Sequence, residues 1–147
     1  MKKESSYAQI FLRLALGIGF IYPVLDRIGW LGPADGKNIG WGDWVTFLAY
    51  THSLMPILSK SLTDFFGLIA TIAEVTFGIL LIIGYKTRLA SIGSFILLLG
   101  FATCMAITLG LKAPFNYSVF TASAAALLLA YIGDYKWSFD NLKINKN

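Results

Sequence analysis

The stretch LTDFFGLIATIAEVTFGILLIIG, residues 62–84, decides the fold of this chain. It carries only two charged residues, Asp64 near its start and Glu74 near its middle. A transmembrane helix needs about 20 consecutive and mostly apolar residues. Residues 62–84 are therefore predicted to cross a lipid bilayer as a single helix.

Three further runs of the same kind lie on either side, at residues 7–29, 89–111 and 117–133. The last is the shortest, so we expect it to begin somewhat earlier or to be tilted. The connections at residues 85–88 and 112–116 are short, which makes the helices they join antiparallel neighbours. The pattern predicts an all-α integral membrane four-helix bundle, with residues 1–147 forming one transmembrane domain.

The composition supports this class. Hydrophobic residues make up 56% of the chain and charged residues 14%, against roughly 25% charged residues in a typical soluble domain. The net charge of +4 comes from residues scattered at the ends of apolar runs, so no nucleic-acid partner is predicted. The single cysteine, Cys104, cannot form an intrachain disulfide and is interpreted as a packing residue.

The long first connection contains its own apolar segment. Asp43 can cap a helix that Pro56 ends. One side of this helix would carry the apolar residues Trp44, Phe47, Leu48, Met55 and Leu58. We predict a short interfacial or re-entrant helix between the first and second spans. A loop packed against the bundle is the alternative.

Lysine and arginine residues outside the spans predict the orientation. Seven lie on the side of the two termini: Lys2, Lys3, Lys86, Arg88, Lys136, Lys143 and Lys146. Four lie on the other side: Arg27, Lys37, Lys60 and Lys112. Because positive residues favour the cytoplasm, we predict an inner-membrane protein with both termini cytoplasmic. The first run is too long for a signal peptide and lacks its cleavage pattern, so it is predicted to be a span.

Helices in lipid associate through small residues, which allow close approach. Ala15 and Gly19 give the first span such a face, and Ala70 and Gly78 give the second span another. Glu74 lies between these last two residues on the same stripe.

Glu74 is the most informative residue, because a carboxylate near the middle of a span must face the bundle, pair or become protonated. Arg13, in the first span, is its predicted partner. Two interpretations stay open. Either the pair is structural and fixes two helices together, or it forms a polar centre that binds a ligand headgroup or relays protons.

A second charged site lies at the outer end of the first span. It comprises Asp26 and Arg27, with Tyr22 one turn before Asp26. The site is either a solvated helix end or a binding mouth. The single histidine, His52, is not accompanied by other ligands, so no metal site is predicted. No catalytic residue can be assigned from motifs.

At two places the chain resembles the DoxX and DoxD family of small bacterial membrane proteins. Residues 13–28, RLALGIGFIYPVLDRI, resemble the opening helix of the family. Residues 74–90, EVTFGILLIIGYKTRLA, are similar to its Glu, Gly, Leu-rich, Gly, Thr-Arg-Leu-Ala run. The sequence departs from the family at Pro23-Val24, where relatives often have His-Gly, and at Arg27, where Lys is more usual. The first departure weakens any redox or metal role carried over from that histidine.

The resemblance implies a four-helix membrane bundle, and DoxD is a subunit of a thiosulfate:quinone oxidoreductase. We therefore expect a quinone-linked or accessory subunit of a membrane oxidoreductase system. The alternatives are a non-enzymatic lipid- or isoprenoid-binding or assembly protein, and a small transporter or proton path. No intrinsic cofactor is expected and a quinone is the one candidate. The expected partners are the lipid bilayer, a redox partner protein and a second copy of the chain.

Overall fold

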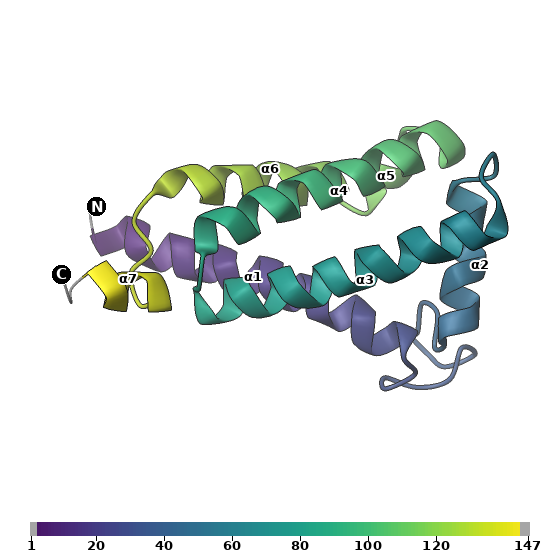
Figure 1. Ribbon diagram of the computed structural model, residues 1–147, viewed down its shortest axis with the longest axis horizontal. Coiled ribbons are helices and arrows are strands. Elements are labelled where there is room, and N and C mark those ends of the chain that lie inside the picture. The colour runs from purple at the N-terminus through teal and green to yellow at the C-terminus, as the bar shows by residue number, and fades with distance from the viewer. Residues whose placement is uncertain (1–2, 145–147) are drawn as a thin grey trace.

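The computed structural model describes residues 3–144, and all regular structure in this range is helical (Figure 1). Four helices run along the long axis: α1 (Lys3–Arg27), α3 (Lys60–Ile83), α4 (Thr87–Leu109) and α6 (Val119–Ile132). Helix α2 (Trp44–Leu54) lies across one end, called here the α2 end, and α5 (Lys112–Asn116) is short. The opposite end, the terminal end, holds α7 (Phe139–Ile144) and both termini. Lys2 and Lys146, used above to predict orientation, lie outside the described residues.

Within residues 3–144, three helices are long and apolar enough to cross a membrane: α1 from Ser6 onward, α3 and α4. Helix α6 has 14 residues and is roughly 21 Å long, against about 30 Å of hydrocarbon in a bilayer. The expectation that this helix begins before residue 117 is wrong, because α6 starts at Val119. Ser118 adopts the left-handed conformation with φ 55, which interrupts the helical structure between α5 and α6.

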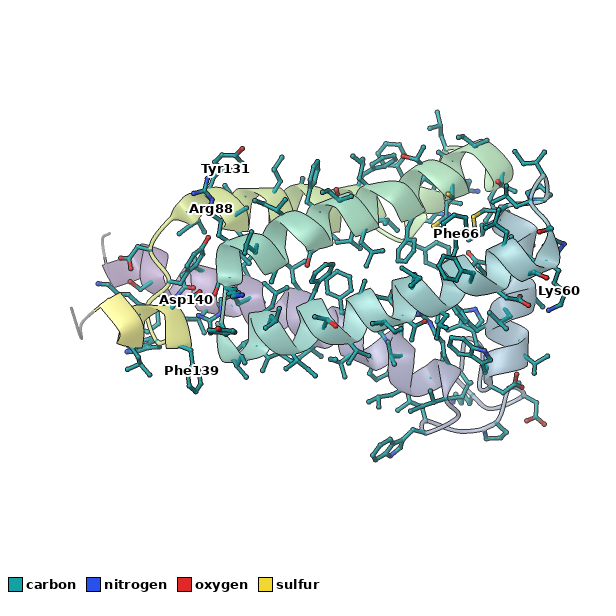
Figure 2. All side chains as sticks on the ribbon, viewed as in Figure 1. Lys60, Phe66, Arg88, Tyr131, Phe139 and Asp140 are labelled. Carbon is teal, nitrogen blue, oxygen red and sulfur yellow. The ribbon has the colours of Figure 1, made fainter. Side chains whose placement is uncertain are left out.

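The side chains are distributed as in a membrane protein. Large apolar side chains face outward, with Phe11 76% and Ile107 81% exposed. Polar side chains are buried, and Gln9, Thr63 and Ser94 are completely inaccessible. Among the labelled residues of Figure 2, charged groups lie at the two ends. Because this arrangement inverts that of a soluble protein, lipid is the solvent for the outer surface.

The helices pack in two antiparallel pairs, α1 with α3 and α4 with α6, and a tight turn joins α3 to α4. The backbones of α1 and α3 approach closely at Gly17 and Gly78. A Cβ atom at Gly17 would lie 2.9 Å from the Gly78 carbonyl oxygen. The prediction of Gly78 as a packing residue is confirmed, whereas Gly19 has no atom of a neighbour within 4 Å of its Cβ position. Gly17 takes the place predicted for Gly19.

The predicted helix in the first connection is confirmed as α2. Asp43 caps it by accepting a hydrogen bond from the Thr46 amide at 2.7 Å, and this bond lowers the pKa of the Asp43 carboxyl. The helix ends at Leu54, two residues before Pro56. Phe47 and Thr51 are buried, since α2 packs against α3, α4 and the end of α1. The alternative, an irregular loop, is wrong.

The C-terminal segment closes the terminal end. Asp140 accepts hydrogen bonds from the amides of Lys86 and Thr87, both at 2.8 Å, and so caps the start of α4. The Tyr135 hydroxyl donates to the carbonyls of Leu129 and Ala130 at the end of α6. Burial raises the pKa of Tyr135. These contacts satisfy backbone groups that helix ends leave free.

Candidate functional site

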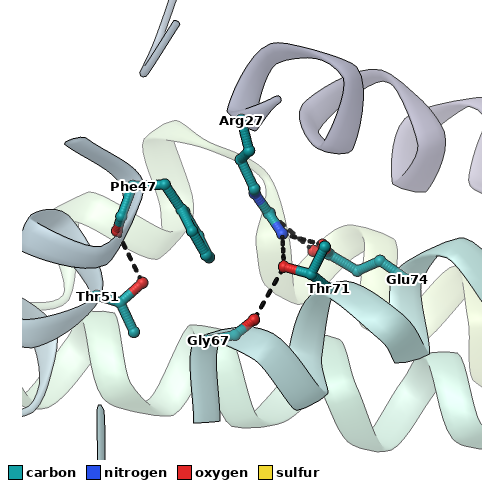
Figure 3. Close-up of polar contacts among 6 residues, drawn as sticks. All are labelled: Arg27, Phe47, Thr51, Gly67, Thr71 and Glu74. Atoms are coloured by element: carbon teal, nitrogen blue, oxygen red, sulfur yellow. Dashed lines mark hydrogen bonds and ion pairs between the residues drawn. The ribbon is translucent and has the colours of Figure 1, made fainter. Parts of the chain in front are cut away.

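The most polar part of the bundle interior is an ion pair between α1 and α3 (Figure 3). The Arg27 guanidinium donates through Nη1 to Glu74 Oε2 and through Nη2 to Glu74 Oε1, the latter at 3.1 Å. Arg27 Nη1 also donates to Thr71 Oγ1 at 2.9 Å. Both charged side chains are 5% exposed. The two-point geometry is the strong form of an arginine–carboxylate contact, so the two charges are neutralised together.

Thr71 anchors this pair to the backbone of α3. Its hydroxyl accepts from Arg27 and donates to the Gly67 carbonyl at 2.8 Å. Thr63, Gly67, Thr71, Glu74 and Gly78 form one buried stripe of α3. The stripe repeats every three or four residues, as expected for one face of a helix.

Two aromatic rings lie over Arg27 on the side of the α2 end. The Phe47 ring centroid is 4.1 Å from Arg27 Cζ, and the Trp41 centroid is 5.1 Å from it. The two rings meet edge to face at 5.6 Å. A guanidinium is attracted to the face of an aromatic ring, and more strongly where water is excluded. The rings therefore stabilise the charge of Arg27 and separate it from the aqueous surface.

One atom of the centre has no partner. Arg27 Nε is buried and makes no hydrogen bond to any described residue. Buried donors are usually satisfied, so this N–H is an exception among the buried polar groups of the described residues. We call Arg27, Glu74, Thr71, Trp41 and Phe47 the Arg27–Glu74 centre.

The predicted pairing of Arg13 with Glu74 is wrong. Arg13 Nε instead donates to the Leu81 carbonyl at 3.0 Å, and Nη2 donates to the carbonyls of Ile82 at 3.3 Å and Trp137 at 3.4 Å. Leu81 and Ile82 belong to the last turn of α3, where carbonyls lack helical partners and the helix dipole favours a cation. Arg13 is thus a cap for α3.

The register of α1 against α3 explains the error. Gly78 on α3 packs against Gly17 and Ile21 on α1. Glu74 lies four residues before Gly78. Because the two helices are antiparallel, the level of Glu74 lies four residues further along α1, between positions 21 and 25. Arg13 is at least eight residues from that level, roughly 12 Å along the axis, whereas Arg27 is at most six residues away, roughly 9 Å. Side chains also tilt toward the N-terminus of their own helix. Arg27 therefore leans toward Glu74 and Arg13 leans away.

Of the other predicted site residues, Asp26 lies beside the Arg27–Glu74 centre and Tyr22 does not. Asp26 lies next to Arg27 and is buried, accepting hydrogen bonds from the amides of Gly40, Trp41 and Gly42. Tyr22 is 56% exposed on the outer face of α1, so the structure does not bring it to the centre. Asp26 and Arg27 were predicted as a site separate from Glu74, but the structure joins them into one.

Sequence reasoning missed Phe47, Trp41 and Thr71 as parts of this centre. A signal for Thr71 was present, because it lies on the same α3 stripe as Glu74. His52, on α2, contacts Thr63 Oγ1 through Nδ1 at 3.3 Å. Among the residues that the structure describes, no three His, Cys, Asp or Glu side chains are grouped to hold a metal ion.

The profile of one protein family, described as "TQO small subunit DoxD", matches residues 8–147. The chain belongs to the DoxD family. Of the two related family names that the sequence suggested, DoxD is the one that matches. The match contains every residue of the Arg27–Glu74 centre. Comparisons with curated proteins and with solved structures gave no significant match.

DoxD membership and the three long apolar helices together identify a membrane protein. Within the match, Arg27 and Glu74 lie on the two segments, residues 13–28 and 74–90, that carried the resemblance.

Proposed function

We propose that this DoxD protein is an accessory subunit of an inner-membrane oxidoreductase system, and that its Arg27–Glu74 centre binds the head of a membrane quinone. The family description, small subunit of TQO, supports the subunit role. The observation that carries the quinone proposal is the buried and unpartnered Nε–H of Arg27 beside two aromatic rings.

The residues of the centre offer the donor and the apolar rings that a quinone head would use once the Trp41 ring moves away from Arg27. The head is a flat ring with carbonyl acceptors, and binding sites for such ligands combine apolar walls with a few well-placed polar groups. Arg27 Nε would donate to a carbonyl, and Trp41 and Phe47 would flank the ring. Glu74 and Thr71 hold the guanidinium in place through Nη1 and Nη2. A bound quinone would supply electron transfer, with a redox partner protein as the other participant.

A melting assay on the purified protein in detergent tests the proposal. A ligand that binds only the folded state stabilises it by RT ln(1 + [L]/Kd), about 2.7 kcal/mol at a hundredfold excess over Kd. We expect ubiquinone or menaquinone analogues to raise the melting temperature of the unsubstituted protein. Arg27→Lys keeps a cation beside Glu74 but removes Nε–H, so it should abolish most of that increase.

Two further variants make the assay specific. Glu74→Gln should weaken the quinone response, because it loosens the partner that orients Arg27. Lys60→Ala removes an exposed cation at the same end of the molecule and should respond like the unsubstituted protein. If no quinone shifts the melting of a cooperatively unfolding protein, the quinone proposal fails.

A second candidate function is supported by a different feature. An open groove of about 290 Å³ lies between α1 and α6. It is lined mainly by apolar and small side chains: Leu12, Ala15, Leu16, Ser118, Thr121, Ala122 and Ala125. A continuous apolar groove of this kind suits an alkyl or isoprenoid chain, so the alternative is a non-enzymatic lipid- or isoprenoid-binding protein.

Ligands that carry only a quinone head or only an isoprenoid tail distinguish the two functions. A quinone without its tail should stabilise the protein if the Arg27–Glu74 centre is the binding site. A polyprenol, which has a tail and no quinone ring, should stabilise it if the groove is the site. Ala122→Leu narrows the groove and should reduce only the polyprenol response.

A further inference from the structure

The loop between α1 and α2 is anchored by one carboxylate. Asp26 Oδ2 accepts hydrogen bonds from the amides of Gly40 at 2.9 Å and Trp41 at 3.3 Å, and Oδ1 accepts from the Gly42 amide at 3.0 Å. Asp26 is 6% exposed, and a buried carboxylate requires such partners. Three consecutive amides are therefore gathered around one side chain of α1.

The two glycines allow this arrangement. A Cβ atom at Gly40 would lie 2.9 Å from Asp26 Oδ2. Gly42 adopts φ +70, and a Cβ atom there would lie 2.2 Å from the Ala34 amide nitrogen. A side chain at either position would displace the loop from Asp26.

Trp41 connects this anchor to the Arg27–Glu74 centre. Its amide is bound by Asp26, and its ring lies over Arg27 with the Phe47 ring beside it. Tyr50, at 6.0 Å, forms the other neighbour of the Trp41 ring. Phe47 is fixed by its place in α2, whereas Trp41 belongs to the loop that precedes this helix. The position of Trp41 therefore depends on the contacts of its loop.

We propose that Asp26 is a positioning residue, which holds residues 40–42 so that Trp41 covers Arg27 and controls access to the Arg27–Glu74 centre from the α2 end. Only the identity of the ligand rests on the proposed function. The cover itself is a property of the chain and can be measured without any quinone.

The first test makes Trp41 the only tryptophan. Trp30, Trp44 and Trp137 are replaced by Phe, and acrylamide quenching of Trp41 fluorescence is measured in this background. Asp26→Ala should increase the quenching constant severalfold and shift the emission to longer wavelength. Asp43→Ala is the matched control, because it removes an aspartate at the same end that caps α2 and leaves the Trp41 amide bound. It should leave quenching nearly unchanged.

The second test measures access to Glu74 in the chain with all four tryptophans. A water-soluble carbodiimide is added, and modification of Glu74 is quantified by mass spectrometry. Asp26→Ala removes all three hydrogen bonds to the loop and should raise the rate of modification at least about tenfold, because the loss of a single hydrogen bond to a charged group already shifts an opening equilibrium by about that factor. Gly40→Ala should also raise the rate of modification, and it keeps the Asp26 charge. The test can therefore still be made if Asp26→Ala does not fold.

Two results would overturn the proposal. One is unchanged quenching and modification in a folded Asp26→Ala or Gly40→Ala protein. The other is an equal increase in Asp43→Ala, which would mean that the whole α2 end loosens without a specific role for Asp26. Neither result bears on the quinone melting assay, so the two proposals fail independently.

Discussion

Arg27 and Glu74 hold opposite charges in the interior of a bundle whose outer surface faces lipid. Each charge would be costly there by itself, because moving an ion out of water is penalised by several kcal/mol unless it is paired and hydrogen-bonded. Their two-point contact, the Thr71 hydroxyl and the two aromatic rings together supply that compensation.

A double-mutant cycle tests this pair. Arg27→Leu and Glu74→Leu should each lower the free energy of unfolding by about 3–5 kcal/mol, because each leaves an uncompensated buried charge. The double substitution should recover part of the loss. Unfolding in mixed detergent micelles gives the four free energies.

The exposed pair Lys60–Asp64 provides the matched control, with a 2.7 Å contact and a lysine side chain that is 74% exposed. Lys60→Ala should cost less than about 1 kcal/mol. Strictly additive losses for Arg27→Leu and Glu74→Leu would contradict a direct interaction between the two residues.

At the scale of elements, the contact of α1 with α3 sets where every polar residue of these helices lies. Gly17 and Gly78 allow the two backbones to approach closely, and this contact fixes the register. With that register, Arg27 is brought near Glu74 and Arg13 reaches the last turn of α3. The electrostatics of the bundle therefore depend on a contact between two glycines.

Two neighbouring glycines of α1 separate this effect from helix propensity. Gly17→Ala places a methyl group 2.6 Å from Ile82 Cγ1 and 2.9 Å from the Gly78 carbonyl oxygen. It should destabilise the protein by about 1–3 kcal/mol, as overpacking does. Gly19→Ala meets no neighbour within 4 Å and should be neutral or stabilise by up to about 1 kcal/mol. Equal effects in thermal unfolding would show that α1 and α3 do not meet at Gly17.

At the scale of the whole molecule, both termini lie at one end and α2 lies at the other (Figure 1). This arrangement agrees with a chain that returns to the side from which it started. The distribution of lysine and arginine residues then predicts which side of the membrane holds the termini. Those of the terminal end that the structure describes include Arg88, which Figure 2 labels toward that end of the bundle.

We predict that the terminal end is cytoplasmic, because seven positive residues lie on that side and four on the other. Alkaline phosphatase, which is active only outside the cytoplasm, should be inactive when fused after Asn147 and active when inserted within residues 35–38. The same insertion made with a reporter that works only in the cytoplasm should be inactive. Active phosphatase at the C-terminus would reverse the orientation.

The class of this protein follows from its amino-acid sequence alone. Apolar runs of membrane-crossing length and an aspartate before α2 are local signals, and local physics is enough to interpret them. Glu74 was identified in the same way, because a carboxylate inside an apolar run must be compensated in any membrane protein.

The partner of Glu74 is set by how the helices pack against each other. Arg13 and Arg27 both lie on α1, and nothing in their local sequence distinguishes them as partners. The choice depends on the relative register of two helices, which Gly17 and Gly78 set, and on the tilt of side chains toward the start of each helix. The aromatic cover depends in addition on a loop whose shape comes from Asp26 binding three amides. Contacts between residues distant in sequence have no periodic signal, so they become visible only when the chain is folded.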